Sequence, residues 1–139
     1  MKTNASLVAL FTVLLLLGVG CARHEGAYAP VHTPGADLEN QAKFVLLDRA
    51  TRNSVTVSGL QERLLEDGRL EVIANVRNRL NRRIEVQINC VFKDSRGFPI
   101  QDDVPFGTLI LTENAQEGVR FVSAVPGAET YTIRVRQAR

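Results

Sequence analysis

Tryptophan is absent from the 139-residue chain, and histidine and cysteine occur only twice each. Both histidines, His24 and His32, lie before residue 42, where the pattern typical of a folded domain begins. A Ser-His-Asp triad within that domain is therefore excluded. A zinc site is not expected either, because two histidines in a linker supply too few ligands and hold them too loosely. The sequence has no glycine-rich phosphate-binding loop, and we expect no metal and no cofactor.

The chain also lacks a large excess of charge of either sign, since 17 lysines and arginines face 15 acidic residues. Nucleic-acid binding is not expected, because it depends on a basic excess that this chain does not have. The proportions of 45% hydrophobic and 23% charged residues are ordinary for a globular protein. A length of 139 residues allows one domain.

The longest apolar run lies at the N-terminus and has the form of a secretory signal peptide. Lys2 supplies the positive charge, and a mostly apolar segment of 13 residues extends from Ala5 to Leu17. A membrane-spanning helix needs about 20 such residues, so this segment is too short to cross a bilayer. We therefore expect residues 1–20 to be removed during export.

The end of this segment resembles the lipobox of bacterial lipoproteins. Gly20 and Cys21 match the small residue and the cysteine of that motif, whereas Gly18 stands where leucine is usual. The resemblance implies that the Cys21 thiol receives a diacylglycerol and that the new amino group, formed by cleavage before Cys21, is acylated, for example with palmitate. Several acyl chains hold a protein stably on a membrane. The alternative is an ordinary cleaved signal, with Cys21 a free or disulfide-bonded thiol.

In a Gram-negative cell, the residue after the cysteine influences whether a lipoprotein stays in the inner membrane or moves to the outer membrane. By analogy with known lipoproteins, aspartate at this position is associated with retention in the inner membrane, and this chain has Ala22. We therefore expect an outer-membrane lipid anchor facing the periplasm. Residues 21–41 contain two prolines and two glycines and no periodic apolar pattern, which is typical of a flexible linker. The folded domain is then expected over residues 42–139.

Apolar and polar residues alternate with period two through much of this domain, as in half-buried strands. Every second residue from Leu70 to Val76 is apolar, and the pairs Asp67-Gly68 and Pro126-Gly127 favour turns. We expect strands near 43–49, 54–58, 60–66, 69–78, 83–93, 104–112, 117–124 and 129–137. Short strands separated by turns predict an all-β fold, an immunoglobulin-like β-sandwich.

The C-terminal half contains the segments IEVQINCVFKDSRG (84–97) and VPFGTLILTENAQEGVRFVSAVPGAETYTIRVR (104–136). Their combination resembles the YcfL-type family of small Gram-negative lipoproteins, a domain family without an assigned activity. The chain departs from the family pattern at Phe106, where a tryptophan or similar large aromatic residue is expected. The resemblance implies an immunoglobulin-like sandwich and a location in the cell envelope, and it implies no catalytic residue.

Two groups of side chains in the domain carry reactive chemistry in principle. Cys90 is in phase with the apolar residues of its strand, so we expect it to be buried and inert rather than a reactive thiol. Asp94, Asp102 and Asp103 cluster near one loop, and paired carboxylates can perform acid–base chemistry or hold Ca²⁺. Turn formation by Asp94 and solvated charge at the other two positions are the favoured interpretation.

Arginine is the remaining feature. The guanidinium group suits planar recognition of carboxylates and phosphates, so arginines on the expected strands and on the turn between two of them are candidates for partner binding. These candidates are Arg77, Arg79, Arg82, Arg83, Arg134 and Arg136. The competing interpretation is that they only protect sheet edges from aggregation.

Together these observations favour a non-enzymatic lipoprotein that is tethered to a membrane of the cell envelope. Its domain is expected to bind an envelope protein or an envelope polymer such as peptidoglycan. The alternative is an envelope enzyme or small-ligand carrier that uses the loop carboxylates. A deep pocket lined by those carboxylates would favour the alternative, and a filled core with flat sheets would favour the first hypothesis.

Overall fold

The computed structural model describes residues 38–101 and 104–138. Cys21 and both histidines lie outside the described residues, and so does the linker up to residue 37. The predictions for Asp102 and Asp103 also fall outside them.

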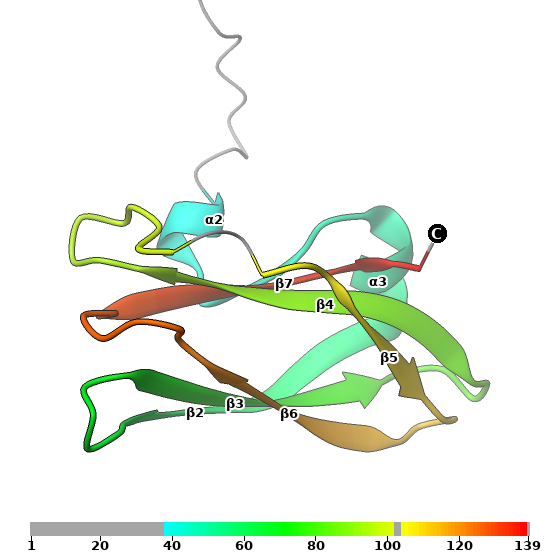
Figure 1. The fold of residues 1–139 in the computed structure, drawn as a ribbon. Coiled ribbons are helices and arrows are strands. Elements are labelled where there is room, and N and C mark those ends of the chain that lie inside the picture. Colours follow the sequence, from blue (N-terminus) through cyan, green and yellow to red (C-terminus); the bar gives the residue numbers. More distant parts are fainter. Residues whose placement is uncertain (1–37, 102–103, 139) are drawn as a thin grey trace, which may run out of the picture. The chain divides into compact units, whose positions relative to one another are not determined.

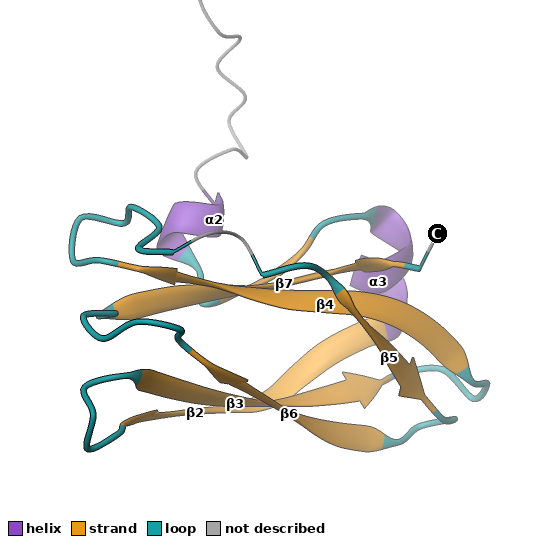
Figure 2. Ribbon diagram, in the orientation of Figure 1, coloured by secondary structure: helices purple, strands orange, loops and turns teal. Residues whose placement is uncertain are grey.

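Within these residues seven strands form two sheets that pack face to face (Figures 1 and 2). The first sheet has the order β1 (Phe44–Leu46), β7 (Thr130–Gln137), β4 (Ile84–Lys93) and β5 (Gly107–Leu111). The second has the order β2 (Val55–Leu64), β3 (Leu70–Asn78) and β6 (Gln116–Val122). Only β1 and β7 pair in parallel among these strands; the other pairs are antiparallel. The predicted all-β sandwich is confirmed.

The order of the strands differs from that of an immunoglobulin constant domain. In that domain the first, second, fifth and fourth strands form one sheet and the third, sixth and seventh form the other. Here the first sheet joins the first, seventh, fourth and fifth strands. The likeness to the immunoglobulin fold is therefore one of architecture, with two sheets enclosing one core.

The core lies between the inner faces of the two sheets, where the predicted alternation is observed. Val72, Ala74 and Val76 of β3 are fully buried, and Ile133 and Val135 of β7 face them from the other sheet. Burying such side chains stabilises a fold by about 25 cal/mol for each Å² of apolar surface removed from water. The buried residues of this alternating pattern therefore hold the two sheets against each other.

One predicted boundary between strands is absent. The segments expected at 54–58 and 60–66 form a single strand, β2, which pairs along the whole of β3. The register shifts between Val57 and Gly59, so a β-bulge occupies the place of the expected turn. Leu60 and Leu64, from the second expected segment, both lie on this strand.

The helix α3 (Arg49–Ser54) was not predicted and separates β1 from β2. Asp48 caps it, because its carboxylate accepts a hydrogen bond of 2.8 Å from the Thr51 N–H. The same carboxylate accepts a bond of 2.6 Å from the N–H of Gln137. Burial opposes the charged form, yet these backbone donors together hold the pKa of Asp48 below its usual value of 3.8. Asp48 therefore fastens α3 to the end of β7.

A short helix, α2 (Leu38–Gln41), occupies residues that the sequence assigned to the linker. The buried Lys93 ammonium donates to the carbonyl oxygen of Glu39 and, at 2.9 Å, to the Thr132 hydroxyl. Thr132 in turn donates to the same Glu39 oxygen at 2.6 Å. The prediction is thus wrong for these four residues, because distant polar groups of β4 and β7 hold them on the domain.

Candidate functional site

The turn between β3 and β4, residues 79–83, carries three arginines at one end of the domain. We call it the arginine turn; Arg79, Arg82 and Arg83 on it are all exposed. The helix α3 lies at the same end (Figure 1) and adds exposed Arg49 and Arg52. Sequence reasoning missed these two, because it placed Arg49 at the end of an expected strand (43–49) and Arg52 in the connection to the next one (54–58). The signal that was available is Asp48, a helix-capping residue type just before them.

Asn78, the last residue of β3, holds the arginine turn in place. Its side chain is fully buried, and its amide nitrogen donates to the carbonyl oxygens of Arg82 at 2.7 Å and Thr112 at 2.8 Å. Its amide oxygen accepts from the Leu80 N–H at 2.9 Å. The N–H of Arg79 donates to the carbonyl oxygen of Ser54 at 2.8 Å, which joins the turn to α3. The arginines therefore stand on a backbone fixed from several sides.

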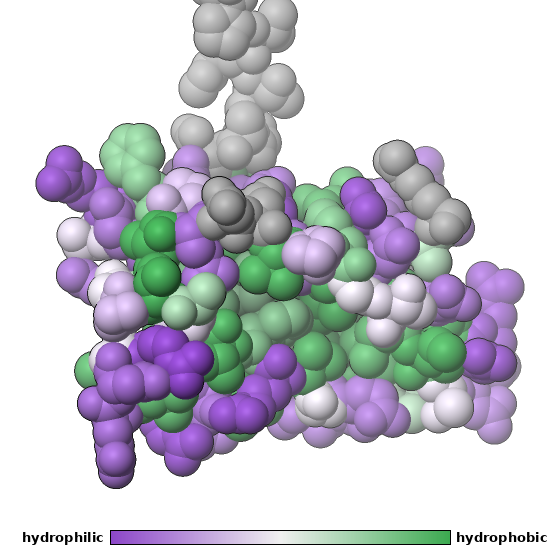
Figure 3. Space-filling model, in the orientation of Figure 1, coloured by the Kyte–Doolittle hydropathy of each residue, from purple (hydrophilic) through white to green (hydrophobic). Residues whose placement is uncertain are grey.

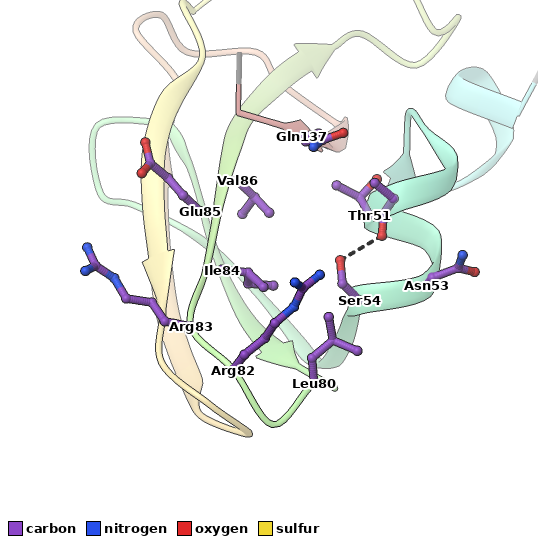
Figure 4. A pocket seen from close by; sticks show the side chains of 11 residues that line it. Thr51, Asn53, Ser54, Leu80, Arg82, Arg83, Ile84, Glu85, Val86 and Gln137 are labelled. Carbon is purple, nitrogen blue, oxygen red and sulfur yellow. Dashed lines mark hydrogen bonds between the residues drawn. The ribbon is translucent and has the colours of Figure 1, made fainter.

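A pocket of about 510 Å³ lies between α3, the arginine turn and the first residues of β4 (Figure 4). Leu80, Ile84 and Val86 supply apolar lining, and Gln137 lies at the end of β7. In Figure 4 the Arg82 side chain extends toward α3, whereas Arg83 points away from it. The structure thus gives two adjacent arginines different surroundings.

The other predicted arginines are placed elsewhere. Arg77 is exposed on the outer face of the β2–β3–β6 sheet, opposite Thr56 and Gln116. Arg134 and Arg136 lie on the outer face of the other sheet, so the six candidates do not form one surface.

Arg134 and Arg136 are engaged within the domain. The Nε of Arg136 donates to the Gln87 side chain at 2.8 Å, and that of Arg134 donates to the Asn89 side chain at 3.0 Å. Both guanidinium groups lie over the Phe106 ring, that of Arg136 at 3.9 Å from the ring centre. The sequence pattern predicted an open polar face, whereas α2 and the segment leading to β5 cover part of it.

Glu71 forms an arginine clamp across the outer face of the β2–β3–β6 sheet. Its carboxylate accepts from Arg63 of β2 at 2.6 Å and from Arg120 of β6 on the other side. Only 3% of Glu71 is exposed, although both arginines are largely exposed. The hydrogen bond from Arg120 is the main reason that the pKa of Glu71 falls below its usual 4.5; burial opposes it and Arg63 reinforces it.

This clamp predicts a specific dependence of stability on pH. A carboxylate whose pKa is lowered by folding stabilises the fold above its unfolded value, 4.5, and loses that contribution as the pH falls through the folded value. The Glu71→Gln variant should therefore be less stable than wild type at pH 7 and lose less stability on acidification below pH 4.5. Urea unfolding between pH 7 and pH 3 measures this. Glu85→Gln, at an exposed position, is the control, and equal acid sensitivity of both variants would contradict the prediction.

Cys90 is buried in the core, as predicted, with 1% of its surface exposed. Burial raises the pKa of its thiol to about 12, against a smaller opposing effect of Arg134 and Lys93. A thiol that stays protonated at neutral pH is neither a nucleophile nor a metal ligand. The prediction of a buried thiol is confirmed.

Asp94 is used by its own turn. Its Oδ1 accepts hydrogen bonds of 2.9 Å from the N–H groups of both Arg96 and Phe98. This is the turn chemistry that the sequence favoured for Asp94. In the part of the chain that the structure describes, no three histidine, cysteine or acidic side chains come together as metal ligands.

Apolar side chains gather along the side of the sandwich where β5 and β6 form the sheet edges (Figure 3). Leu109, Val119 and Phe121 are partly buried there against the core. Neither of the described helices has the length and apolar character needed to cross a bilayer.

The fold is similar to crystal structures of two bacterial proteins. One is cj0090 of Campylobacter jejuni, with a TM-score of 0.55 and 17% sequence identity over 69% of this chain and 98% of that chain. The other is a DUF1425 family member from Shewanella sp. pv-4, with a TM-score of 0.55 and 23% identity over 61% of this chain and 79% of that chain. No protein-family model and no curated protein matches the sequence. The chain thus shares its two-sheet sandwich with small bacterial domains.

Proposed function

We propose that this chain is a non-enzymatic lipoprotein of the bacterial cell envelope, anchored through acylated Cys21 in the outer membrane and facing the periplasm. Its sandwich domain recognises an envelope protein or polymer. The observation that carries the proposal is the sequence Gly20-Cys21 at the end of a short apolar segment. A linker and one small domain follow it, as in a tethered module.

The positions of the candidate residues in the structure support this proposal. The Cys90 thiol is buried and Asp94 serves its own turn, so two of the candidate reactive groups have structural roles. The arginine turn carries three exposed arginines, and no ion pair of theirs occurs within residues 38–101 and 104–138. Free guanidinium groups on a fixed backbone suit recognition more than catalysis. We also propose membership of the YcfL-type family, and the fold shared with the DUF1425 protein supports it.

The anchor is tested by the intact mass of the chain purified from membranes. We expect a chain that begins at Cys21 and carries the added mass of three acyl groups and glycerol, and incorporation of labelled palmitate in growing cells. The Cys21→Ala variant should incorporate none, because no thioether forms and the acylated N-terminal residue is lost. Mass and label are the readouts, since an uncleaved signal segment would itself retain this variant in the membrane.

The other cysteine provides the matched control. Cys90→Ala removes a buried thiol and leaves the signal intact, so labelling should equal that of wild type. An unmodified Cys21 in the purified protein would overturn the proposed anchor.

A further inference from the structure

We propose that the pocket between α3 and the first residues of β4 binds a carboxylate that carries a short apolar group. Arg82 pairs with the carboxylate, and the apolar group contacts Ile84 and Val86. This inference rests on the proposed recognition role of the domain and assigns the ligand class for that role. It does not depend on the lipid anchor.

The apolar part of the pocket is an open end of the hydrophobic core. Ile84 and Val86 are in phase with Ile88 and Cys90 on the inner face of β4, and Val86 is buried while Ile84 is only partly so. Leu80 of the arginine turn adjoins them. An apolar group in this position would cover surface that the two sheets leave partly open. A volume of about 510 Å³ is within the range of small-molecule sites.

Arg82 supplies the charge. Figure 4 shows its guanidinium group directed across the pocket toward Ser54, while Arg83 and Glu85 point away from that space. Among the described residues that line the pocket, Glu85 is the only one with a carboxylate, and none of the described ion pairs joins it to Arg82. A guanidinium beside apolar surface, with no ion-pair partner among residues 38–101 and 104–138, is complementary to a carboxylate because it donates two parallel hydrogen bonds to one.

The backbone that carries Arg82 is already fixed. Its carbonyl oxygen accepts from Asn78, and the Leu80 carbonyl oxygen accepts from the N–H of Asn114 at 2.9 Å. The Arg79 N–H is bonded to Ser54 at the end of α3. Binding therefore orders one arginine side chain and leaves the turn unchanged, which keeps the entropic cost of association low.

The lining favours a monoanionic carboxylate over a phosphate or a nucleotide. Arg82 is the only cationic side chain directed into the pocket in Figure 4, and no lysine belongs to the lining. Phosphate sites use several donors or a nest of backbone N–H groups. None of the lining residues in the described part of the chain is aromatic, so they offer no ring for a base to stack on.

Two sources present this chemistry, the C-terminus of a peptide with an apolar last residue and a free short-chain fatty acid. We would titrate the full chain, purified in detergent, with acetyl-Gly-Gly-Leu and separately with hexanoate, and follow the methyl signals of Leu80 and Ile84 by NMR. We expect a saturable shift with a Kd on the order of 1 mM, which suits a ligand of this size. The amidated peptide and hexanamide should bind on the order of 10-fold more weakly.

Adjacent arginines give a matched pair of variants. Arg82→Gln should weaken binding of the carboxylate by about 10-fold or more, because one charge-assisted pair is lost. Arg83→Gln removes the same formal charge from the next residue and should change the Kd by less than about twofold. Partition of a probe into detergent affects both variants equally, so the comparison isolates the Arg82 contact.

Each outcome decides the proposal. Saturation by the peptide alone assigns a chain terminus as the ligand, saturation by hexanoate alone assigns a fatty acid, and saturation by both assigns the shared chemistry. Absence of a saturable shift with either probe, equal losses in the two arginine variants, or amides that bind as tightly as acids would overturn it. The intact-mass experiment on Cys21 is unaffected by these results, so failure of the anchor and failure of this site are distinguishable.

Discussion

The Asn78→Ala variant should be less stable than wild type by about 3 kcal/mol. This substitution removes four hydrogen bonds at once. Three are donated to the carbonyl oxygens of Arg82, Thr112 and, at a longer 3.4 Å, Leu111, and one is accepted from the Leu80 N–H. Asn78 is fully buried, so water does not reach its position in the native state. Each backbone group left without a partner there costs about 1–3 kcal/mol. The turn can relax to restore part of this loss, so the total is smaller than the sum over the separate groups.

Urea unfolding of Asn78→Ala beside Asn81→Ala measures this effect. Asn81 is an asparagine of the same turn with an exposed side chain, so its replacement should change the free energy of unfolding by no more than about 0.5 kcal/mol. Asn78→Asp should resemble Asn78→Ala or be worse, because a carboxylate would face three carbonyl oxygens. Similar stabilities for Asn78→Ala and Asn81→Ala would show that the Asn78 side chain does not hold the arginine turn.

Asn78 also shows what could be read from the sequence. Asn78 comes two residues after Val76, so the alternation of β3 predicts that its side chain points into the core. Asparagine is a polar residue, however, and its polar neighbours in the sequence indicate an exposed turn between two strands. The phase was the better guide. A polar residue in the inward series at the end of a strand indicates a side chain that serves the backbone of the next turn.

The fold was predictable wherever local pattern decides structure. Alternation located both ends of β3, β4 and β7 to within one residue. The helix α3 was missed because its six residues are too few for a helical period, and because Asp48 receives one of its hydrogen bonds from Gln137, far along the chain. The single strand β2 was divided in two because Gly59 signals a turn, whereas pairing with β3 makes it part of a bulge.

The candidate site was less predictable than the fold. Arg82 and Arg83 are equivalent in the sequence, and only the path of the chain into β4 directs Arg82 toward α3 and Arg83 away from it. The alternation of β7 predicts that the side chains of Arg134 and Arg136 point to the exposed face of the sheet. Phe106 approaches them from a segment some 30 residues away, and no local pattern indicates that contact.

The Cys90 thiol should react with iodoacetamide at least about 1000-fold more slowly in the native chain than in the unfolded chain at neutral pH. Burial raises its pKa to about 12 from 9.0, and each unit lowers the fraction of reactive thiolate 10-fold. Restricted access slows the reaction further, because 1% of the residue is exposed. The rate in the native chain should then follow the rare opening of the core rather than the encounter with reagent.

Mass spectrometry of chain alkylated with and without urea provides the measurement, with Cys90→Ala as the control that removes the buried thiol. Labelling of native Cys90 at the rate of a free thiol would contradict the burial of this side chain. The same experiment bears on the anchor, because acylated Cys21 has no thiol to alkylate. Unfolded wild type should then take up one label and unfolded Cys90→Ala none, whereas an unmodified Cys21 would add one label to each.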